Sequence, residues 1–235
     1  MMYNSVEGNL KKIEEQIAAA CCRAGRKREE ISLMGVTKFH ELEAVEAAHK
    51  AGLKLFGENR VQEAKEKFSR FWEIHSRDSA ELHLIGALQR NKAKIAVSCF
   101  DCVQSVDRDS LIVELGTLTQ GRESPLMILL EYHTGEETKT GFPERDSLFR
   151  AAEKVLSFPG LRPAGLMTMA PFTNDAAAIR SSFRELAGAR DELEKRFKGY
   201  WSCLSMGMTN DFEIAIEEGS TLLRIGTAIF GDRQA

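Results

Sequence analysis

The first part of the chain carries hydrophobic side chains at helical spacing. Val6, Leu10, Ile13, Ile17 and Cys21 recur every three or four residues, and the positions between them are polar or small. Such a stripe is typical of an amphipathic helix that covers a hydrophobic surface. We therefore predict a helix over residues 5–24, which ends before a glycine that tolerates the left-handed conformation of a helix C-terminus.

The rest of the chain alternates between short apolar runs and amphipathic segments. Because the runs are almost continuously apolar, they indicate strands that are covered on both faces. The predicted strands are 31–37, 53–56, 82–85, 101–105, 126–132, 161–167, 201–205 and 221–225. The predicted helices are 41–51, 60–72, 89–97, 108–120, 144–156 and 210–217. In addition, a long helix is predicted to begin after residues 173–175 and to end at about 197, and a short one begins at Thr227. Asp175 is in the predicted N-cap segment of the long helix, and Asn210 and Glu213 have capping-box spacing.

Eight strands, each followed by a helix, favour the α/β class with a parallel sheet. Eight such units in 235 residues match a single (β/α)8 (TIM) barrel with an extra N-terminal helix. An open doubly wound sheet is the alternative, because periodicity does not show whether a sheet closes. No GxGxxG follows a strand and no GxxxxGK[ST] is present, so dinucleotide and P-loop sites lack their main support. No linker divides the chain, and we predict one domain over 1–235.

Composition and charge narrow the class of protein. Hydrophobic residues make up 43% and charged residues 29% of the chain, which excludes a disordered protein. The net charge of −3 gives no basic surplus, so nucleic acid is not an expected partner. The N-terminus lacks the pattern of a signal peptide, and no apolar run is long enough to span a bilayer. We therefore expect a cytoplasmic protein with no membrane partner.

An odd number of cysteines, five, fits reduced thiols in a cytosol. Cys99 and Cys102 have CxxC spacing. A zinc site needs a second ligand pair, which does not follow, and a redox pair belongs at a helix N-terminus, whereas this pair straddles the start of a strand. We favour the interpretation that both fill the core. The five histidines form no evident metal-binding cluster.

Barrels of this kind carry their sites where the strands end. The first strand ends at Lys38, and Met34, Val36 and Lys38 fall on one face of it, while Gly35 and Thr37 fall on the other. If the first set points inward, Lys38 presents an amine in the barrel mouth. Desolvation there favours the neutral amine, which can form a Schiff base with an aldehyde. The alternative is a lysine that reaches solvent from a strand end.

Two loops carry the residue types of a phosphate site. Barrels often bind phosphate in the loops after strands seven and eight, where backbone N–H groups at a helix start favour an anion. Gly207 and Gly226 allow close approach of the backbone, and Ser205 and Thr227 can add hydroxyl donors. Ordinary turn chemistry is the alternative explanation of these residues.

A phosphate site opposite a barrel-mouth lysine suggests pyridoxal phosphate, an aldehyde that carries a phosphate. Arg224 lies on the last strand near the phosphate loops, where the pyridine nitrogen would face it. Because arginine only donates hydrogen bonds, that nitrogen would stay unprotonated and the ring would be a weak electron sink. A structural salt bridge is the alternative role for Arg224.

Four further positions are weaker candidates. Asn59 follows the second strand and is expected near the ring or Lys38. His83 lies on the third strand, where a core histidine satisfied by the backbone is the alternative. Tyr132 ends the fifth strand, and Lys139 lies in the loop after it, where most lysines are simply solvated.

These residues stand in motifs that run in order along nearly the whole chain. The motifs are MGVTK (34–38), FGENRVQE (56–63), HLIGALQRNK (83–92), SVD (105–107), KTG (139–141), GLMTM (165–169), LSMGM (204–208) and RIGTAIFG (224–231). Together they resemble the pyridoxal phosphate homeostasis protein family, also described as alanine-racemase N-terminal-domain-like. The resemblance implies a fold-type III barrel that holds pyridoxal 5′-phosphate as an aldimine on Lys38. It implies that Arg224 faces the pyridine nitrogen.

The resemblance also implies roles for the other candidates, position by position. Asn59 and His83 would line the pocket, and Lys139 would help to handle the cofactor. The residues that would hold the phosphate are Ser205, Gly207, Gly226 and Thr227. The chain departs from the family at 131–132, where Glu-Tyr stands for the usual Val-Asn, at Leu82, where tryptophan is frequent, and at position 87, which is alanine here and is often histidine or another residue in the family. Its last residues lack the lysines of some relatives, so a second cofactor site built from such lysines is not expected.

Two functions from different classes follow from the resemblance. The first is a binding protein that masks pyridoxal phosphate and releases it to apo-enzymes; the second is a cofactor-dependent amino-acid racemase. A two-base racemase needs an acid/base group on each face of its substrate. Lys38 supplies one, but the tyrosine of alanine racemases is supported by a further domain, which we do not expect here. We therefore favour the binding protein, not an enzyme, as a monomer. A phosphosugar-binding barrel would explain the loops but not Lys38 with Arg224.

Overall fold

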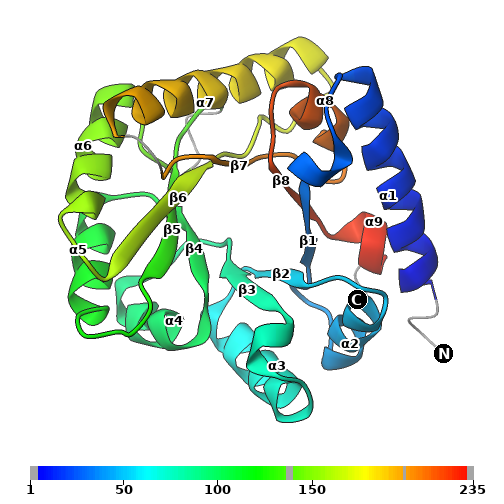
Figure 1. Cartoon of the computed structure of the whole chain (residues 1–235), viewed down its shortest axis with the longest axis horizontal. Helices are drawn as coiled ribbons and strands as arrows, with labels where there is room; N and C mark the ends of the chain where they lie inside the picture. Colours follow the sequence, from blue (N-terminus) through cyan, green and yellow to red (C-terminus); the bar gives the residue numbers. More distant parts are fainter. Residues whose placement is uncertain (1–4, 136–139, 198–199, 232–235) are drawn as a thin grey trace.

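The strands close into a barrel in the computed structural model, which describes residues 5–135, 140–197 and 200–231 (Figure 1). Each strand pairs in parallel with the next one along the chain, and β1 pairs with β8. The strands are β1 (Ser32–Val36), β2 (Leu55–Glu58), β3 (Glu81–Leu84), β4 (Cys102–Val106), β5 (Leu126–Glu131), β6 (Leu161–Met167), β7 (Cys203–Ser205) and β8 (Leu222–Ile225). The closure confirms the predicted (β/α)8 barrel and excludes the open doubly wound sheet.

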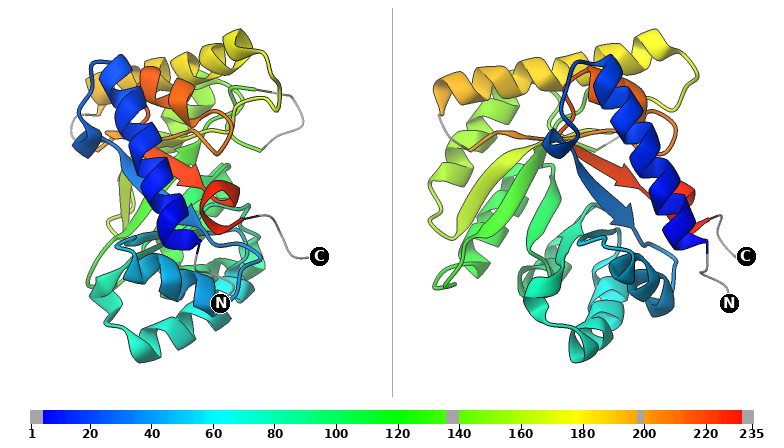
Figure 2. Two further views of the ribbon diagram at one scale, coloured as in Figure 1. Left: turned by 90° about the vertical axis from the view of Figure 1, so that its right-hand side faces the viewer. Right: turned by 45° about the vertical axis from the view of Figure 1, so that its right-hand side comes forward.

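A ring of helices surrounds the barrel in the described part of the chain. The helices are α1 (Val6–Arg23), α2 (Leu42–Lys50), α3 (Val61–Ile74), α4 (Ala93–Cys99), α5 (Asp109–Leu118), α6 (Arg145–Leu156), α7 (Ala176–Arg196), α8 (Phe212–Glu217) and α9 (Thr227–Phe230). From α2 onward each helix follows one strand, as predicted. Helix α1 is the predicted extra helix, and Figure 2 shows it lying alongside α8 and α9. The predicted apolar stripe of α1 is buried.

The N-termini of α7 and α8 show whether the capping interactions predicted from the sequence are present. Asp175 caps α7 as predicted, because its carboxylate accepts hydrogen bonds from two backbone N–H groups of the first turn. The predicted capping box of Asn210 and Glu213 is wrong. The N-cap position of α8 is Asp211, whose side chain makes no capping hydrogen bond to the helix; its Oδ1 accepts from the backbone N–H of Met208, before the helix, at 2.5 Å. Glu213 forms an ion pair with Arg23 of α1 instead, so a contact between helices replaces the local cap.

Two hydrophobic clusters divide the interior. A large one fills the space between strands and helices, and a small one inside the barrel contains Cys102, Leu129 and Met167. Cys99 packs against the large cluster, so the cysteines of the CxxC pair fill two different cores, as the core-filling interpretation predicts. The outer cluster includes the strand residues Leu82, Leu84, Val103, Leu204, Leu223 and Ile225. Because strand side chains alternate, the intervening His83, Gln104, Ser205 and Arg224 point into the barrel.

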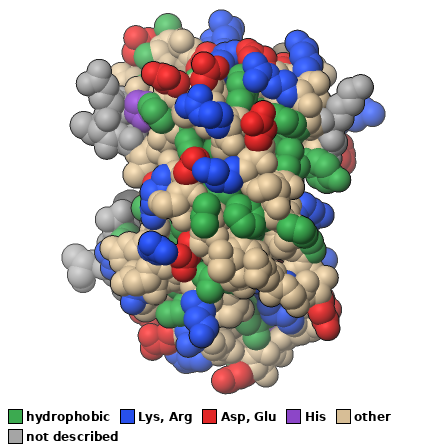
Figure 3. Space-filling view, turned by 90° about the vertical axis from the view of Figure 1, so that its left-hand side faces the viewer, with side chains coloured by type: hydrophobic (Ala, Val, Ile, Leu, Met, Phe, Trp, Pro, Cys, Tyr) green, Lys and Arg blue, Asp and Glu red, His purple; other side chains and the backbone are tan. Residues whose placement is uncertain are grey.

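The outer surface over α5 and α6 mixes charges of both signs. Figure 3 shows Lys and Arg side chains interspersed with Asp and Glu on this face, with hydrophobic side chains between them. Val113 of α5 and Leu156 of α6 are large hydrophobic residues with exposed surface. This face therefore lacks a patch of single charge. In the ranges that the structure describes, no helix is long and apolar enough to cross a membrane.

Candidate functional site

A cavity of about 960 Å³ opens at the carboxyl ends of the strands. It is bounded by the ends of β1, β2, β6 and β8, by the loop between β6 and α7, and by the loop between β7 and α8. Five residues predicted from the sequence line this one cavity: Lys38, Asn59, Arg224, Gly226 and Thr227. The structure therefore brings the predicted lysine, the predicted arginine and residues of both predicted phosphate loops to one cavity.

Lys38 reaches the cavity because of the side-chain parity of β1. Val36 and Lys38 line the cavity. Gly35 faces the opposite way, since a Cβ atom on it would meet Leu53 and Phe230 in the outer layer. The parity predicted from the sequence is the one that the strand adopts, and Lys38 is half-buried at the mouth.

A buried ion pair lies behind Lys38, between the barrel wall and α3. Lys67 Nζ donates to Glu58 Oε1 and to the carbonyl oxygen of Thr37, both at 2.8 Å. Thr37 Oγ1 donates to the same carboxylate oxygen at 2.7 Å. Glu58 is fully buried and Lys67 is almost so. The residue immediately before Lys38 is thus held by its side chain and by its backbone.

The residue after Lys38 is held as well. The backbone N–H of Phe39 donates to Glu63 Oε1 at 2.8 Å, and Lys67 Nζ donates to the same oxygen at 3.3 Å. Phe39 has a φ of 65°, which an L-residue adopts only at a cost. Because Glu63 and Lys67 both lie on the first turns of α3, this helix fixes the turn that presents the lysine.

Burial and the ion pair act in opposite directions on Glu58. Burial raises the pKa of its carboxyl, whereas Lys67 and the hydroxyl of Thr37 lower it, and the net shift is upward. Glu58 Oε2 has no hydrogen-bond partner among the described residues. The pair is therefore one in which loss of the cation would leave a costly buried carboxylate.

Arg224 is a buried cation at the cavity wall. Its side chain is 5% exposed, its Nη1 donates to Ser205 Oγ at 2.7 Å, and its Nη2 donates to the carbonyl oxygen of Thr168 at 2.8 Å. Within the described residues it makes no ion pair with a carboxylate. Burial lowers the pKa of Arg224, and the more distant Asp211 and Glu131 oppose this. A guanidinium has five N–H donors, so Arg224 keeps donors for an acceptor in the cavity.

Ser205 and Gly207 lie behind the cavity wall and do not line it. The Ser205 hydroxyl is fully buried, and it donates to Gln104 Oε1 at 2.6 Å while it accepts from Arg224. Gly207 has a φ of 97°, and a Cβ on it would meet Ala215 of α8 at 2.7 Å. Glycine is therefore required here so that α8 can pack closely. The residues of this loop that do line the cavity are Met208, Thr209, Asn210 and Asp211.

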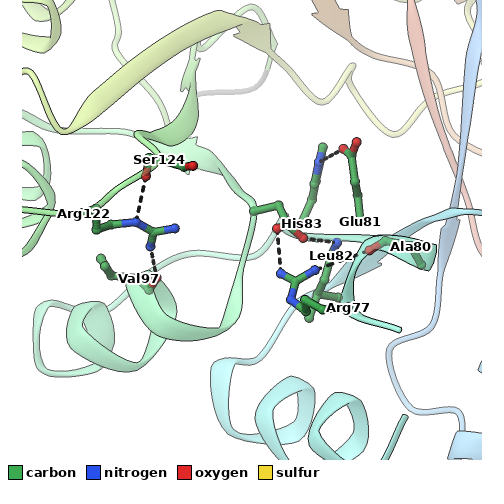
Figure 4. Close-up of polar contacts among 9 residues, drawn as sticks. Arg77, Ala80, Glu81, Leu82, His83, Val97, Arg122 and Ser124 are labelled. Carbon is green, nitrogen blue, oxygen red and sulfur yellow. Dashed lines mark hydrogen bonds and ion pairs between the residues drawn. The ribbon is translucent and has the colours of Figure 1, made fainter. Parts of the chain in front are cut away.

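The remaining predicted residues divide into two groups. Asn59 lines the cavity, and Gly86 makes room for its backbone, because a Cβ on Gly86 would lie 2.3 Å from the Asn59 carbonyl oxygen. His83 is buried deeper in the barrel. Its Nδ1 lies 2.8 Å from Gln104 Nε2, and its Nε2 lies 3.4 Å from Glu81 Oε2, as Figure 4 shows for the second contact. Lys139 lies outside the described residues.

The fifth strand ends at Glu131, one residue earlier than predicted, and Glu131 and the following Tyr132 point to opposite sides. Tyr132 points outward, where its hydroxyl donates to Glu185 of α7 at 2.9 Å. Burial and Glu185 raise the pKa of Tyr132 to about 12. Glu131 is buried, accepts from Thr140 Oγ1 at 2.7 Å, and has a pKa that burial raises. The tyrosine that follows this strand is thus turned away from the barrel interior.

Sequence reasoning missed several residues of the site. His40 lines the cavity, and its pKa is lowered by burial and by Lys67. Its spacing of two residues from Lys38 was a usable signal. Thr168 and Gln104 act through contacts with Arg224 and Ser205, which are distant in sequence, so no local pattern identifies them. The loop that starts at Met169 also contributes to the cavity, although its sequence resembles an ordinary turn.

Comparison with known proteins gives concordant matches. Residues 9–234 match the family model for the alanine racemase N-terminal domain. The pyridoxal phosphate homeostasis protein of Vibrio cholerae is 38% identical over 230 residues, which is 97% of each chain. The crystal structure of an unknown protein from Bifidobacterium adolescentis matches with a TM-score of 0.92 and 32% identity, over 97% of this chain and 96% of that one. PipY of Synechococcus elongatus, solved with PLP bound, matches with a TM-score of 0.81 and 30% identity, over 93% of this chain and 100% of PipY.

Proposed function

Because this chain belongs to the alanine racemase N-terminal domain family, together with the pyridoxal phosphate homeostasis proteins, we propose that it binds pyridoxal 5′-phosphate (PLP) in the mouth cavity and serves in homeostasis of that cofactor. The related PipY was solved with PLP bound, at 30% identity over its whole length. The observation that carries the proposal is the placement of Lys38 and Arg224 on the wall of one cavity.

The donor set of the cavity fits this cofactor. PLP supplies an aldehyde that condenses reversibly with an amine. Lys38 provides the amine, and Arg224 keeps N–H donors for the pyridine nitrogen, which we expect to accept one of them. A buried guanidinium without a carboxylate partner favours a ligand that is anionic or accepts hydrogen bonds.

The phosphate would lie at the loop after β8. Gly226 and Thr227 line the cavity, and Gly226 is the N-cap of α9. The first N–H groups of a helix have no partner within the helix, so they are available to phosphate oxygens. Ser205 and Gly207 would support this loop from behind rather than contact the phosphate by their side chains. His83 would act from beneath the site through its contact with Gln104.

The outward direction of Tyr132 favours a binding protein over a racemase. A two-base racemase needs a second acid/base group opposite Lys38. Tyr132 donates to Glu185 in the helical layer, and burial raises its pKa, so it is neither placed nor poised to move a proton in the cavity. The cavity is large and open to solvent, which favours exchange of the cofactor. We expect a cytoplasmic monomer whose recipients are apo-enzymes that need PLP.

The decisive experiment is reduction with sodium borohydride in the presence of PLP, followed by tryptic mapping. A phosphopyridoxyl group on Lys38 blocks cleavage there, so the modified peptide would span residues 29–50 rather than 29–38. Lys65→Ala, on the exposed side of α3, is the matched control and should keep the adduct, whereas Lys38→Ala should lose it. No adduct on 29–50 would overturn the proposal. Amino-acid racemisation that disappears in Lys38→Ala would favour the racemase instead.

A further inference from the structure

A continuous chain of hydrogen bonds crosses the interior of the barrel. Arg224 Nη1 and Ser205 Oγ are 2.7 Å apart, and Ser205 Oγ and Gln104 Oε1 are 2.6 Å apart. Gln104 Nε2 lies 2.8 Å from His83 Nδ1, and His83 Nε2 lies 3.4 Å from Glu81 Oε2. The chain joins β8 and β7 on one side of the barrel to β4 and β3 on the other. It runs from Arg224 at the cavity wall to Glu81 at the N-terminal end of β3. Figure 4 shows the last contact, between His83 and Glu81.

The orientation of the Gln104 amide sets the direction of the bonds in this chain. Ser205 Oγ accepts from Arg224 and faces Gln104 Oε1, an oxygen that only accepts, so Ser205 donates its proton to Gln104. Gln104 therefore accepts with its carbonyl oxygen and donates with its amide nitrogen to His83 Nδ1. His83 then carries its proton on Nε2 and donates it to Glu81. In this arrangement the buried side chains of Ser205, Gln104 and His83 each have a hydrogen-bond partner.

We propose that Gln104 and His83 are positioning residues that orient the Arg224 guanidinium toward the ligand. This proposal rests on the proposed binding of PLP. Arg224 is fixed at two points, Ser205 Oγ and the Thr168 carbonyl oxygen. Ser205 is a good acceptor only while its proton has somewhere to go, and Gln104 is the side chain that takes it. Gln104 and His83 themselves lie outside the cavity wall, so their effect on a ligand passes through Arg224.

Burial makes the chain sensitive to the loss of one member. Gln104 and Ser205 are fully or almost fully buried, and His83 is 6% exposed. In such surroundings a donor without an acceptor is not rescued by water, so Ser205 would turn its proton elsewhere. Loss of the Gln104 acceptor should therefore free one of the two anchors of Arg224 without touching the ligand.

Two substitutions of Gln104 separate the two ends of the chain. Gln104→Leu removes the acceptor for Ser205, and we expect PLP to bind about fivefold more weakly, the size of one net hydrogen bond, with a shifted absorption maximum of the bound cofactor. Gln104→Glu keeps that acceptor but cannot donate to His83. It should restore most of the affinity and move the His83 ring proton to Nδ1, which 15N NMR of the imidazole detects.

The matched control is Cys102→Ala, on the same face of β4 but outside the chain of hydrogen bonds. It should lower the melting temperature while leaving the affinity and the absorption maximum unchanged. Wild-type affinity and spectrum in Gln104→Leu would overturn the proposal. So would a cofactor-free wild type whose His83 proton lies on Nδ1. The NMR measurement needs no cofactor, so it tests the chain of hydrogen bonds even if borohydride mapping shows that the protein does not bind PLP.

Discussion

Arg224 is a buried cation that we expect to contribute more to ligand binding than to the stability of the fold. Desolvation of a guanidinium is costly, and within the described residues no carboxylate pairs with it. Replacing such a charge by an apolar side chain of similar length is often neutral or stabilising. We therefore predict that Arg224→Met melts at the same temperature as the wild type or higher, while its affinity for PLP falls by about tenfold or more, since a charge-assisted hydrogen bond is lost.

Thermal unfolding without cofactor and absorbance titration with PLP measure the two effects separately. Arg150→Met is the matched control, because Arg150 is exposed on α6 and should change neither quantity. An Arg224→Met protein that melts far below the wild type would contradict this account. The guanidinium would then be needed to fold the barrel, as in a structural salt bridge.

At the residue scale, the sequence predicts side chains whose position depends on one strand. Lys38 follows from the parity of β1, and Arg224 from its place on the last strand. The surroundings of Ser205 and His83 could not be predicted in this way. Their partner Gln104 comes from β4, 101 residues away from Ser205 in sequence. Long-range contacts of this kind leave no local pattern, so the contacts of these two residues with Gln104 could not be predicted from the sequence.

Helix α3 acts on the site through the turn that follows β1. Lys67 binds the Thr37 carbonyl and the Glu58 carboxylate, so Lys67→Met would leave Glu58 buried without its cation. Breaking a buried pair costs about 3–5 kcal/mol, and we predict a loss of stability of this size. Because Lys38 sits on the released turn, we also expect slower formation of the borohydride-trapped adduct. Chemical denaturation and timed trapping measure the two effects.

The pH dependence of Lys67→Met gives a second test. The pKa of Glu58 is raised by burial, and loss of Lys67 removes an interaction that lowers it. A folded-state pKa above the unfolded value means that stability is present at low pH and is lost as pH rises through the folded pKa. The deficit of Lys67→Met against the wild type should therefore shrink as pH falls from neutrality toward 5. A deficit that is constant with pH, or equal to that of exposed Lys65→Met, would contradict the role of Glu58.

At the element scale, periodicity predicts which segments are helices and strands but is weaker at their ends. The start of α8 illustrates the reason. Asn210 and Glu213 have the spacing of a capping box, yet Glu213 pairs with Arg23 of α1, and α8 begins after Asp211, whose side chain makes no capping hydrogen bond. Tyr132 is a similar case, because the strand ends at Glu131 and the tyrosine turns toward Glu185 of α7. In both cases a helix distant in sequence decides the outcome.

At the scale of the whole molecule, the count of eight strand–helix units predicts the barrel, whereas closure depends on the pairing of the first strand with the last. β1 and β8 are paired over Ser32–Leu222, Leu33–Leu223, Met34–Arg224 and Gly35–Ile225. Helix α1 covers this seam through contacts with α8 and α9. Its apolar stripe was readable from the sequence, but the surface that the stripe covers was not, because α8 and α9 belong to the other end of the chain.

Helix α1 combines a residue that stabilises the molecule with one that supports the site. Ile17 is fully buried in the outer core, and Asn9 Nδ2 donates to the Ile229 carbonyl of α9 at 2.9 Å. Helix α9 begins at Thr227, which lines the cavity. We predict that Ile17→Ala costs about 2–5 kcal/mol of stability but leaves the PLP affinity of the folded protein unchanged.

Asn9→Ala should do the reverse. We expect a stability loss of only about 1 kcal/mol and a measurable loss of PLP affinity, because the variant lacks the hydrogen bond to the Ile229 carbonyl that holds α9 in place. Denaturation curves and PLP titrations of both variants, at a temperature where both are folded, separate the two roles. If affinity falls in proportion to stability in both, α1 acts only as a cover for the seam. If it falls in Asn9→Ala alone, the first helix of the chain positions the last one, and barrel closure itself is part of the binding site.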